Sequence, residues 1–321
     1  MRNKMFDAIK GLAIISVVFS HTYRGFSDPG AIFIREIAMW SVPAFFILQG
    51  YFLYSPKPKP WLSNTFKKVK KAYIPYLVWA VFYGIFYLLV TAKSFTLEDV
   101  ILGKTAIHLY FMFHYMIFAI FLPLLYFIPA IYRRIIIWFM ILSNLTLTII
   151  LEISKAEQIR IIPYSGPNPA KWWGFVAIGM LIAESPAIIS FCRKHPRITI
   201  LTAISLFLFG IIQPYAIGHV GYLFNKFALW PMSLGLLLLI ALYYNKNGAI
   251  FKDELAYIGE RTFGIYLPHI LILYYLQLII PGQRIVSIVI ILIACIVLTN
   301  LKNYFEKQIA SIMKWPKSQC K

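Results

Sequence analysis

The sequence is short of charge, and of negative charge above all. Asp, Glu, Lys and Arg make up 13% of the 321 residues, whereas soluble globular proteins contain about 25%. Hydrophobic residues make up 60% of the chain, and its mean hydropathy is +0.73. A chain of this composition has too few charged residues for the surface of a soluble fold, so an ordinary soluble protein is excluded.

Cysteines and the common chemical motifs are also scarce. The three cysteines, Cys192, Cys295 and Cys320, are too scattered for a disulfide framework or a cysteine-rich metal site. Glycine-rich phosphate loops, Ser-x-x-Lys sets and Cys-x-x-Cys pairs are missing, and no repeat with a period of about 20–50 residues is visible. These absences exclude the usual nucleotide-binding and thiol-redox sites, and no metal site is predicted.

Long apolar stretches take the place of these features. They recur from end to end with short polar gaps, and most approach the length of about 20 residues that crosses a bilayer. Two of them, 172–185 and 198–213, are short and would need extension or a thinned bilayer. The stretches are 8–25, 32–54, 73–91, 106–129, 135–151, 172–185, 198–213, 228–244, 263–280 and 285–301. The sequence therefore predicts an all-α integral membrane protein, a single domain over residues 1–321 with about ten transmembrane helices.

The basic residues gather in alternate loops. A formal net charge of +19 would favour nucleic-acid binding in a soluble protein, but no basic helix lies outside the apolar stretches to read a nucleic acid. Most of the 31 lysines and arginines instead lie where cytoplasmic loops would meet anionic membrane lipids. Both termini are therefore predicted to be cytoplasmic, with a short basic tail at about 302–321. The sequence predicts no particular oligomeric state.

Three ionisable residues lie in or beside the first apolar stretch. Such groups cost roughly 2.5–3.5 kcal/mol each on insertion scales, so each is a functional candidate. Asp7, Lys10 and His21 lie on one stripe of a helix, which we expect to face the bundle interior. Lys10 would lie near the cytoplasmic face and paired with Asp7, with His21 about 16 Å farther along the helix axis. His21 is then either an interhelical hydrogen-bonding residue or a catalytic group.

Five segments resemble motifs of the membrane acyltransferase-3 family, in the same order along the chain. Phe6–Ala13, followed by an apolar run to His21, is similar to the family's opening, in which ten residues separate a basic residue from a histidine. The others resemble the Phe-Phe-x-Leu-Ser-Gly-Phe/Tyr motif, a basic stretch ending in Ile-Pro-Tyr, the His-Leu-Trp-Phe-Leu stretch and a late Tyr-Leu-x-His segment. They are Phe45–Tyr51, Lys67–Tyr76, His108–Met112 and Gly264–His269. Gln49 replaces the usual serine, while Lys10 and Tyr110 replace the commoner arginine and tryptophan.

The resemblance implies an O-acetyltransferase of the bacterial plasma membrane. Such an enzyme moves an acyl group, usually acetyl, from cytoplasmic acetyl-coenzyme A to a hydroxyl of a surface polysaccharide or a related lipid-linked glycan, and no metal is implied. His21 would take the proton of the attacking hydroxyl or carry the acyl group transiently. Asp7 would fix Lys10 on the donor side.

A basic cluster precedes the third predicted span. It consists of Lys67, Lys68, Lys70 and Lys71. Its charge suits the phosphates of coenzyme A, and it would equally serve as a positive-inside anchor.

The predicted acceptor-binding residues are polar groups expected at membrane depth. Arg35 and Glu36 open the second span near the level of His21, where they would orient acceptor hydroxyls or form an interfacial ion pair. His108 lies too far around a helix from His114 for the two to share a metal. The full set is Arg35, Glu36, Gln49, His108, Tyr110 and His269.

Three tryptophans begin apolar stretches on the predicted outer side. Trp172, Trp173 and Trp230 predict an aromatic belt at the membrane interface, although rings there are also able to stack on a sugar.

Two other functions fit the same features. A transporter or flippase of a small polar or glycan substrate would line its path with Asp7, Lys10 and His21. A catalytically inactive sensing domain of the same fold, which Gln49 makes conceivable, would bind the donor without turnover. Release of free coenzyme A from acetyl-coenzyme A separates the enzyme from both.

Overall fold

The regular structure of the described residues is entirely helical, which confirms the predicted all-α fold. The computed structural model describes residues 3–25, 27–53, 61–157, 168–218, 220, 226–244 and 249–313. The helices are α1 (Lys4–Thr22), α2 (Pro29–Ala38), α3 (Ser41–Leu53), α4 (Trp61–Thr91), α5 (Leu97–Ile101), α6 (Tyr110–Phe121), η1 (Leu122–Phe127), α7 (Ala130–Ala156), η2 (Pro169–Lys171), α8 (Trp173–Glu184), α9 (Pro186–Lys194), α10 (Pro196–Ala216), α11 (Leu229–Tyr244), α12 (Lys252–Glu260), α13 (Thr262–Tyr266), α14 (His269–Ile279) and α15 (Arg284–Met313).

The chain is a multi-pass membrane protein. In the described residues, 7 helical stretches are long and apolar enough to cross a membrane, or up to 8 if α8 and α9, bent by 76°, form one span. Two shorter apolar helices, α11 and α14, occupy the remaining predicted stretches. Every predicted stretch therefore coincides with a helix. The count of ten crossings and the cytoplasmic termini stay predictions.

The two short predicted stretches reach their final lengths differently. The stretch 198–213 lies inside α10, which has 21 residues. The stretch 172–185 forms only the 12 residues of α8. Pro186 then begins α9 in a new direction, because a proline fits the first turn of a helix but lacks the N–H needed in its interior. At this bend the Glu184 carboxylate accepts a hydrogen bond of 2.5 Å from Arg133 Nε, so its charge is paired.

Two helices run beyond their predicted spans. α4 begins at Trp61 and so contains the basic run that was expected to precede a helix. α15 continues to Met313, because no glycine or proline interrupts it there and Lys302 pairs with Glu306 one turn on, at 3.5 Å. The first part of the predicted tail is therefore helical, and 314–321 lie outside the described residues.

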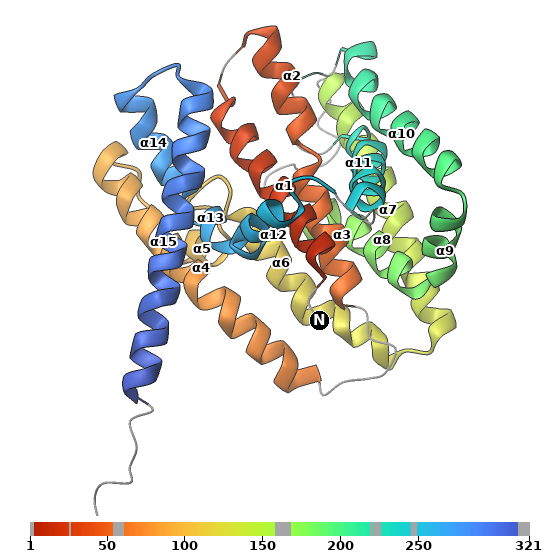
Figure 1. Cartoon of the computed structure of the whole chain (residues 1–321), viewed down its shortest axis with the longest axis horizontal. Coiled ribbons are helices and arrows are strands. Elements are labelled where there is room, and N and C mark those ends of the chain that lie inside the picture. Colours follow the sequence, from red (N-terminus) through yellow and green to blue (C-terminus); the bar gives the residue numbers. More distant parts are fainter. Residues whose placement is uncertain are drawn as a thin grey trace, which may run out of the picture.

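Helix α1 lies in the middle of the bundle and belongs to two hydrophobic cores. Figure 1 shows it between α4, α14 and α15 on one side and α7 to α11 on the other. Ala8 and Ala13 pack in one core with residues of α3, α8 and α11. Ile14 and Val18 pack in the other with residues of α4, α14 and α15. A polar side chain on the buried face of α1 is thus directed into the protein.

Helix α12 crosses α1 with the two backbones in contact. A Cβ atom added to Gly259 would meet the carbonyl oxygen of Asp7, and one added to Gly11 would meet the carbonyl oxygen of Leu255. Glycine permits such an approach because it has no side chain. The crossing fixes α12 against the first turns of α1, where Asp7 and Lys10 lie.

Candidate functional site

Three histidines from distant parts of the chain meet beside the last turn of α1. His21 belongs to that turn, His108 to the turn before α6, and His269 begins α14. The ring centroids lie 5.3 Å apart for His21 and His269, 4.9 Å for His108 and His269 and 6.4 Å for His21 and His108. His108 and His269 are buried, at 2% and 0% exposure, while His21 is partly exposed. We call these three residues the histidine cluster.

Backbone carbonyls and tyrosine hydroxyls hold the cluster. The Tyr266 hydroxyl donates to the carbonyl oxygen of His108, and the His269 Nδ1 atom lies 2.6 Å from the carbonyl oxygen of Tyr266. A carbonyl only accepts hydrogen bonds, so Nδ1 of His269 carries the proton and Nε2 is left with a lone pair.

A break in the helix sets the position of His269. α13 ends at Tyr266 and α14 starts after Pro268, which has no N–H to continue the hydrogen-bond ladder. The buried Tyr83 hydroxyl spans the break, donating to the carbonyl of Leu267 at 2.8 Å and accepting from the N–H of Leu271 at 3.2 Å. Tyr83 therefore pairs the Leu267 carbonyl and adds a second acceptor for the N–H of Leu271, which also donates to the carbonyl of Pro268 at 3.0 Å.

The other end of the α1 stripe carries an ion pair. The Lys10 ammonium contacts the Asp7 carboxylate, as their spacing predicts, and the Asp7 side chain is 3% exposed against 26% for Lys10. The carboxylate is thus held inside the protein, while the lysine keeps part of its surface exposed. One helix carries this pair at its start and a histidine of the cluster at its end.

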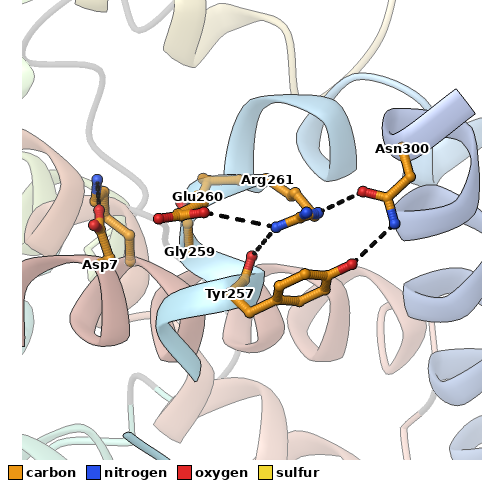
Figure 2. A network of polar contacts seen from close by, with 8 residues as sticks. Asp7, Tyr257, Gly259, Glu260, Arg261 and Asn300 are labelled. Atoms are coloured by element: carbon orange, nitrogen blue, oxygen red, sulfur yellow. Dashed lines mark hydrogen bonds and ion pairs between the residues drawn. The ribbon is translucent and has the colours of Figure 1, made fainter. Parts of the chain in front are cut away.

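A polar network braces α12 beside the ion pair, as Figure 2 shows. Arg261 donates from Nε to Asn300 of α15 at 2.8 Å and from Nη1 to the carbonyl oxygen of Tyr257 at 2.9 Å. Its guanidinium also lies 3.4 Å from the centroid of the Tyr257 ring, and Asn300 donates to the Tyr257 hydroxyl at 2.9 Å. The guanidinium is committed to these contacts, so Arg261 acts as a brace between α12 and α15 that keeps Gly259 against Asp7.

The basic cluster lies on the first half of α4. The side chains of Lys67, Lys70 and Lys71 are exposed, and at spacings of three and four residues they lie on one face of the helix. The side chain of Lys68 lies outside the described residues. An exposed row of ammonium groups is free to meet phosphates by charge neutralisation.

Glu36 has a partner that the sequence analysis missed. Its carboxylate pairs with the ammonium of Lys226, and the two residues are 4% and 1% exposed. Glu36 is therefore enclosed within the bundle, with an ion-pair partner from a distant part of the chain. Burial lowers the pKa of Arg24, in the turn after α1, and the charge of Arg35 lowers it further. Arg24 and Arg35 thus lie within electrostatic reach of one another near the C-terminal end of α1.

Gln49 and Tyr110 contact helix α6 and the turn before α8, respectively. Gln49 donates from Nε2 to the carbonyl oxygen of Tyr115 at 2.7 Å and is 6% exposed. The Tyr110 ring stacks on Trp172 with centroids 6.1 Å apart. The predicted acceptor-binding set therefore divides. His108 and His269 join His21, whereas the hydrogen bond of Gln49 to Tyr115 ties α3 to α6.

Two tryptophans predicted for an interfacial belt are core residues instead. Trp172 and Trp230 are 3% and 6% exposed. Trp172 lies against Phe46 at 5.3 Å and Trp230 against Phe175 at 4.5 Å between centroids. Hydrophobicity alone does not tell whether such a ring faces lipid or protein, and here the close packing of α3, α8 and α11 directs both inward.

Besides Lys226, the sequence analysis missed Tyr83 and the role of Tyr266. The available signals were a hydroxyl in an apolar span and a tyrosine just before a proline break.

Among the described residues, no group of three or more His, Cys, Asp or Glu side chains is arranged to hold a metal ion. The cluster's geometry suits proton transfer and acyl transfer by imidazole.

Comparison with known proteins agrees with this arrangement. Residues 3–301 match the acyltransferase-3 family, whose model is described as an acyltransferase domain. The match includes all three members of the histidine cluster and the five segments that resemble family motifs. The comparisons with curated proteins and with solved structures found no match. Because the family model covers nearly the whole chain, the protein belongs to the membrane acyltransferase-3 family.

Proposed function

We propose that this membrane acyltransferase is an O-acetyltransferase of a bacterial plasma membrane. It moves an acetyl group from cytoplasmic acetyl-coenzyme A to a hydroxyl of a cell-surface polysaccharide or a related lipid-linked glycan. Residues 1–321 act as one catalytic domain. The observation that carries the proposal is that α1 joins the Asp7–Lys10 pair at one end to the histidine cluster at the other.

The donor binds at the inner end of α1. Lys10 offers a cation there, held by Asp7, and the exposed lysines of α4 offer more positive charge. Coenzyme A carries several phosphates, which favour such ammonium groups. We assign phosphate binding to Lys67, Lys68, Lys70 and Lys71 together with Lys10.

The acyl group reacts at the histidine cluster. His21 is its partly exposed member, so it is the one that a thioester and a hydroxyl can both approach. It acts as a general base or as a transient acyl carrier. Arg35 and Tyr110 contact the acceptor from the outer side, with His108 and His269 beneath it. Glu36 and Gln49 support the acceptor site from within the bundle, Glu36 through its ion pair with Lys226 and Gln49 through its hydrogen bond to the carbonyl oxygen of Tyr115.

The test compares two histidine substitutions in cells whose envelope glycan is assayed for ester-linked acetate. His21→Ala removes the proposed reacting group and should abolish gene-dependent acetate. His114→Ala is the matched control, since His114 is also buried but bonds to the carbonyl oxygen of Tyr110 at 2.7 Å and lies outside the cluster. Equal acetylation in wild type and His21→Ala, at equal protein levels, would remove the assignment.

A second measurement separates the enzyme from the rival functions. Purified protein in lipid nanodiscs is given acetyl-coenzyme A and the alkali-treated envelope glycan as acceptor. An acetyltransferase releases free coenzyme A together with esterified glycan. A transporter or an inactive binding domain leaves the thioester intact, and that result would refute the proposed function.

A further inference from the structure

The histidine cluster contains two imidazoles in very different settings, His21 and His269. His21 is partly exposed. His269 is fully buried, at 0% exposure, and its Nδ1 is engaged by the carbonyl oxygen of Tyr266. Of the two rings, only that of His21 has part of its surface open.

The Nε2 atom of His269 is buried and has no hydrogen-bond partner among the described residues, as is also true of both ring nitrogens of His108 and of Nε2 of His114. Within the histidine cluster, the His269 ring lies nearer to His21 than the His108 ring does, at 5.3 Å against 6.4 Å between centroids. Burying a polar atom without a partner is unfavourable, so such an atom next to His21 calls for an explanation. The tautomer set by Tyr266 makes Nε2 a lone-pair acceptor, which is the state that a general base needs.

The surroundings of His269 keep this state in place. Tyr83 holds both sides of the helix break that precedes α14, so the ring starts from a fixed backbone. The His21 ring lies 5.3 Å away between centroids. A hydroxyl that attacks a carbonyl group carried by His21 therefore lies within reach of His269.

We propose that the two histidines divide the chemistry of the proposed acetyl transfer, with His21 carrying the acetyl group and His269 acting as the general base for the acceptor hydroxyl. The inference rests on the proposed function and assigns separate roles to the cluster's members. His269, which the sequence analysis predicted to bind substrate, becomes a catalytic residue.

The reaction then balances in two steps. In the first, a nitrogen of His21 attacks the thioester carbonyl, the C–N bond forms, the C–S bond breaks, and the imidazole proton of His21 ends on the thiol of coenzyme A. In the second, the acceptor hydroxyl attacks the acetyl carbonyl while Nε2 of His269 takes its proton. The C–N bond breaks, His269 returns the proton to His21, and both imidazoles are restored.

Two substitutions of His269 separate a base from a merely structural residue. In His269→Asn the side-chain amide can still donate to the Tyr266 carbonyl, in place of Nδ1, but it provides no base. His269→Ala removes both functions. Each variant is purified in nanodiscs, given acetyl-coenzyme A labelled in the acetyl group, and assayed for labelled protein and for labelled glycan after addition of alkali-treated envelope glycan.

The expected result is specific to the second step. His269→Asn should keep formation of labelled protein while ester transfer to the glycan falls by about 10²–10⁴-fold, the usual contribution of a general base. His21→Ala should lose the label altogether, and His114→Gln should behave as wild type. The proposal is overturned if His269→Asn transfers acetyl at the wild-type rate, or if it loses protein labelling as His21→Ala does.

Failure of the proposed function would look different. In that case wild-type protein would neither release free coenzyme A nor esterify the glycan. If wild type is active without any labelled protein, His21 carries no acetyl group and the division of roles is wrong while the acetyltransferase stands. If His269→Ala alone fails to fold, His269→Asn still decides the matter, because it keeps the Tyr266 contact.

Discussion

The ammonium of Lys226 lies against the carboxylate of Glu36, and both side chains are almost completely enclosed by protein. The pair joins α2 to the segment that leads into α11. That segment is fixed a second time, since the N–H of Phe227 donates to the Glu152 carboxylate of α7 at 3.0 Å. Two buried acids therefore hold the start of α11 against α2 and α7.

Breaking this pair should destabilise the protein strongly. Lys226→Met leaves the Glu36 carboxylate buried without its ammonium partner, and removing one member of a buried pair costs about 3–5 kcal/mol. We expect a large fall in the thermal unfolding temperature in detergent. The double variant Glu36→Gln with Lys226→Met should recover most of the loss, and a double variant as unstable as Lys226→Met would contradict this account.

Tyr83 should affect activity more than stability. Tyr83→Phe removes the hydrogen bonds to Leu267 and Leu271, costing about 1–3 kcal/mol and loosening the backbone that carries His269. Tyr76→Phe is a matched control, because the buried Tyr76 hydroxyl on the same helix donates to the carbonyls of Val100 and Ile101 at 2.8 and 3.0 Å. The two variants should melt alike, but only Tyr83→Phe should lose acetyl transfer. Equal activities would show that Tyr83 does not position the site.

The α4 lysines should act on donor binding alone. Replacing Lys67, Lys70 and Lys71 with glutamine should raise the KM for acetyl-coenzyme A with little change in kcat, since charge neutralisation binds ground and transition states alike. Added salt should weaken the difference from wild type, because these side chains are exposed. The control is Lys302→Gln with Lys307→Gln on the exposed end of α15. A KM unchanged by the α4 substitutions would leave these lysines as a membrane anchor.

Apolar length was sufficient to predict the position of the apolar helices. Each predicted stretch coincides with one helix or with two consecutive helices, because burying backbone hydrogen bonds within the segment is the only way for a single segment to cross lipid. The spacing of Asp7 and Lys10 likewise predicted their ion pair. These features depend on neighbours within one or a few turns, so a single sequence contains them.

The site's long-range contacts were beyond the same reasoning. Nothing local relates Lys226 to Glu36, or Tyr83 to the break at Pro268, since each contact depends on how separate helices pack. The backbone contact of Gly11 and Gly259 between α1 and α12 is another such long-range feature. The inward positions of Trp172 and Trp230 also depend on helix packing, which is why the predicted belt was wrong for these two residues.

The contact between α1 and α12 should tolerate no added methyl group. In Gly259→Ala the new Cβ would meet the backbone carbonyl of Asp7, which cannot rotate away as a side chain would. Overpacking of this kind costs about 1–3 kcal/mol or more, and it would also displace Asp7 and Lys10. We expect lower thermal stability and lower acetyl transfer. Gly30→Ala is the control, because its Cβ would meet only Asp28 Oδ1 at 3.5 Å, and a variant Gly259→Ala with wild-type stability would contradict the backbone contact.

The junction of α2 and α15 should lose stability in acid because of Asp28. Its carboxylate accepts hydrogen bonds from Arg284 of α15 at 2.7 Å and from the N–H of Ala31 at 2.8 Å. These bonds, that from Arg284 most of all, hold the pKa of Asp28 below its ordinary value. A lowered pKa in the folded state means that the carboxylate stabilises the fold above its ordinary pKa near 4 and loses this effect as the pH falls through its folded value. The thermal unfolding temperature, measured from pH 7 to pH 3, should therefore fall below about pH 4. In Asp28→Asn this fall should be smaller. Asparagine keeps the helix cap but not the charge, so an identical acid profile in this variant would show that the Asp28–Arg284 pair does not stabilise the junction of α2 and α15.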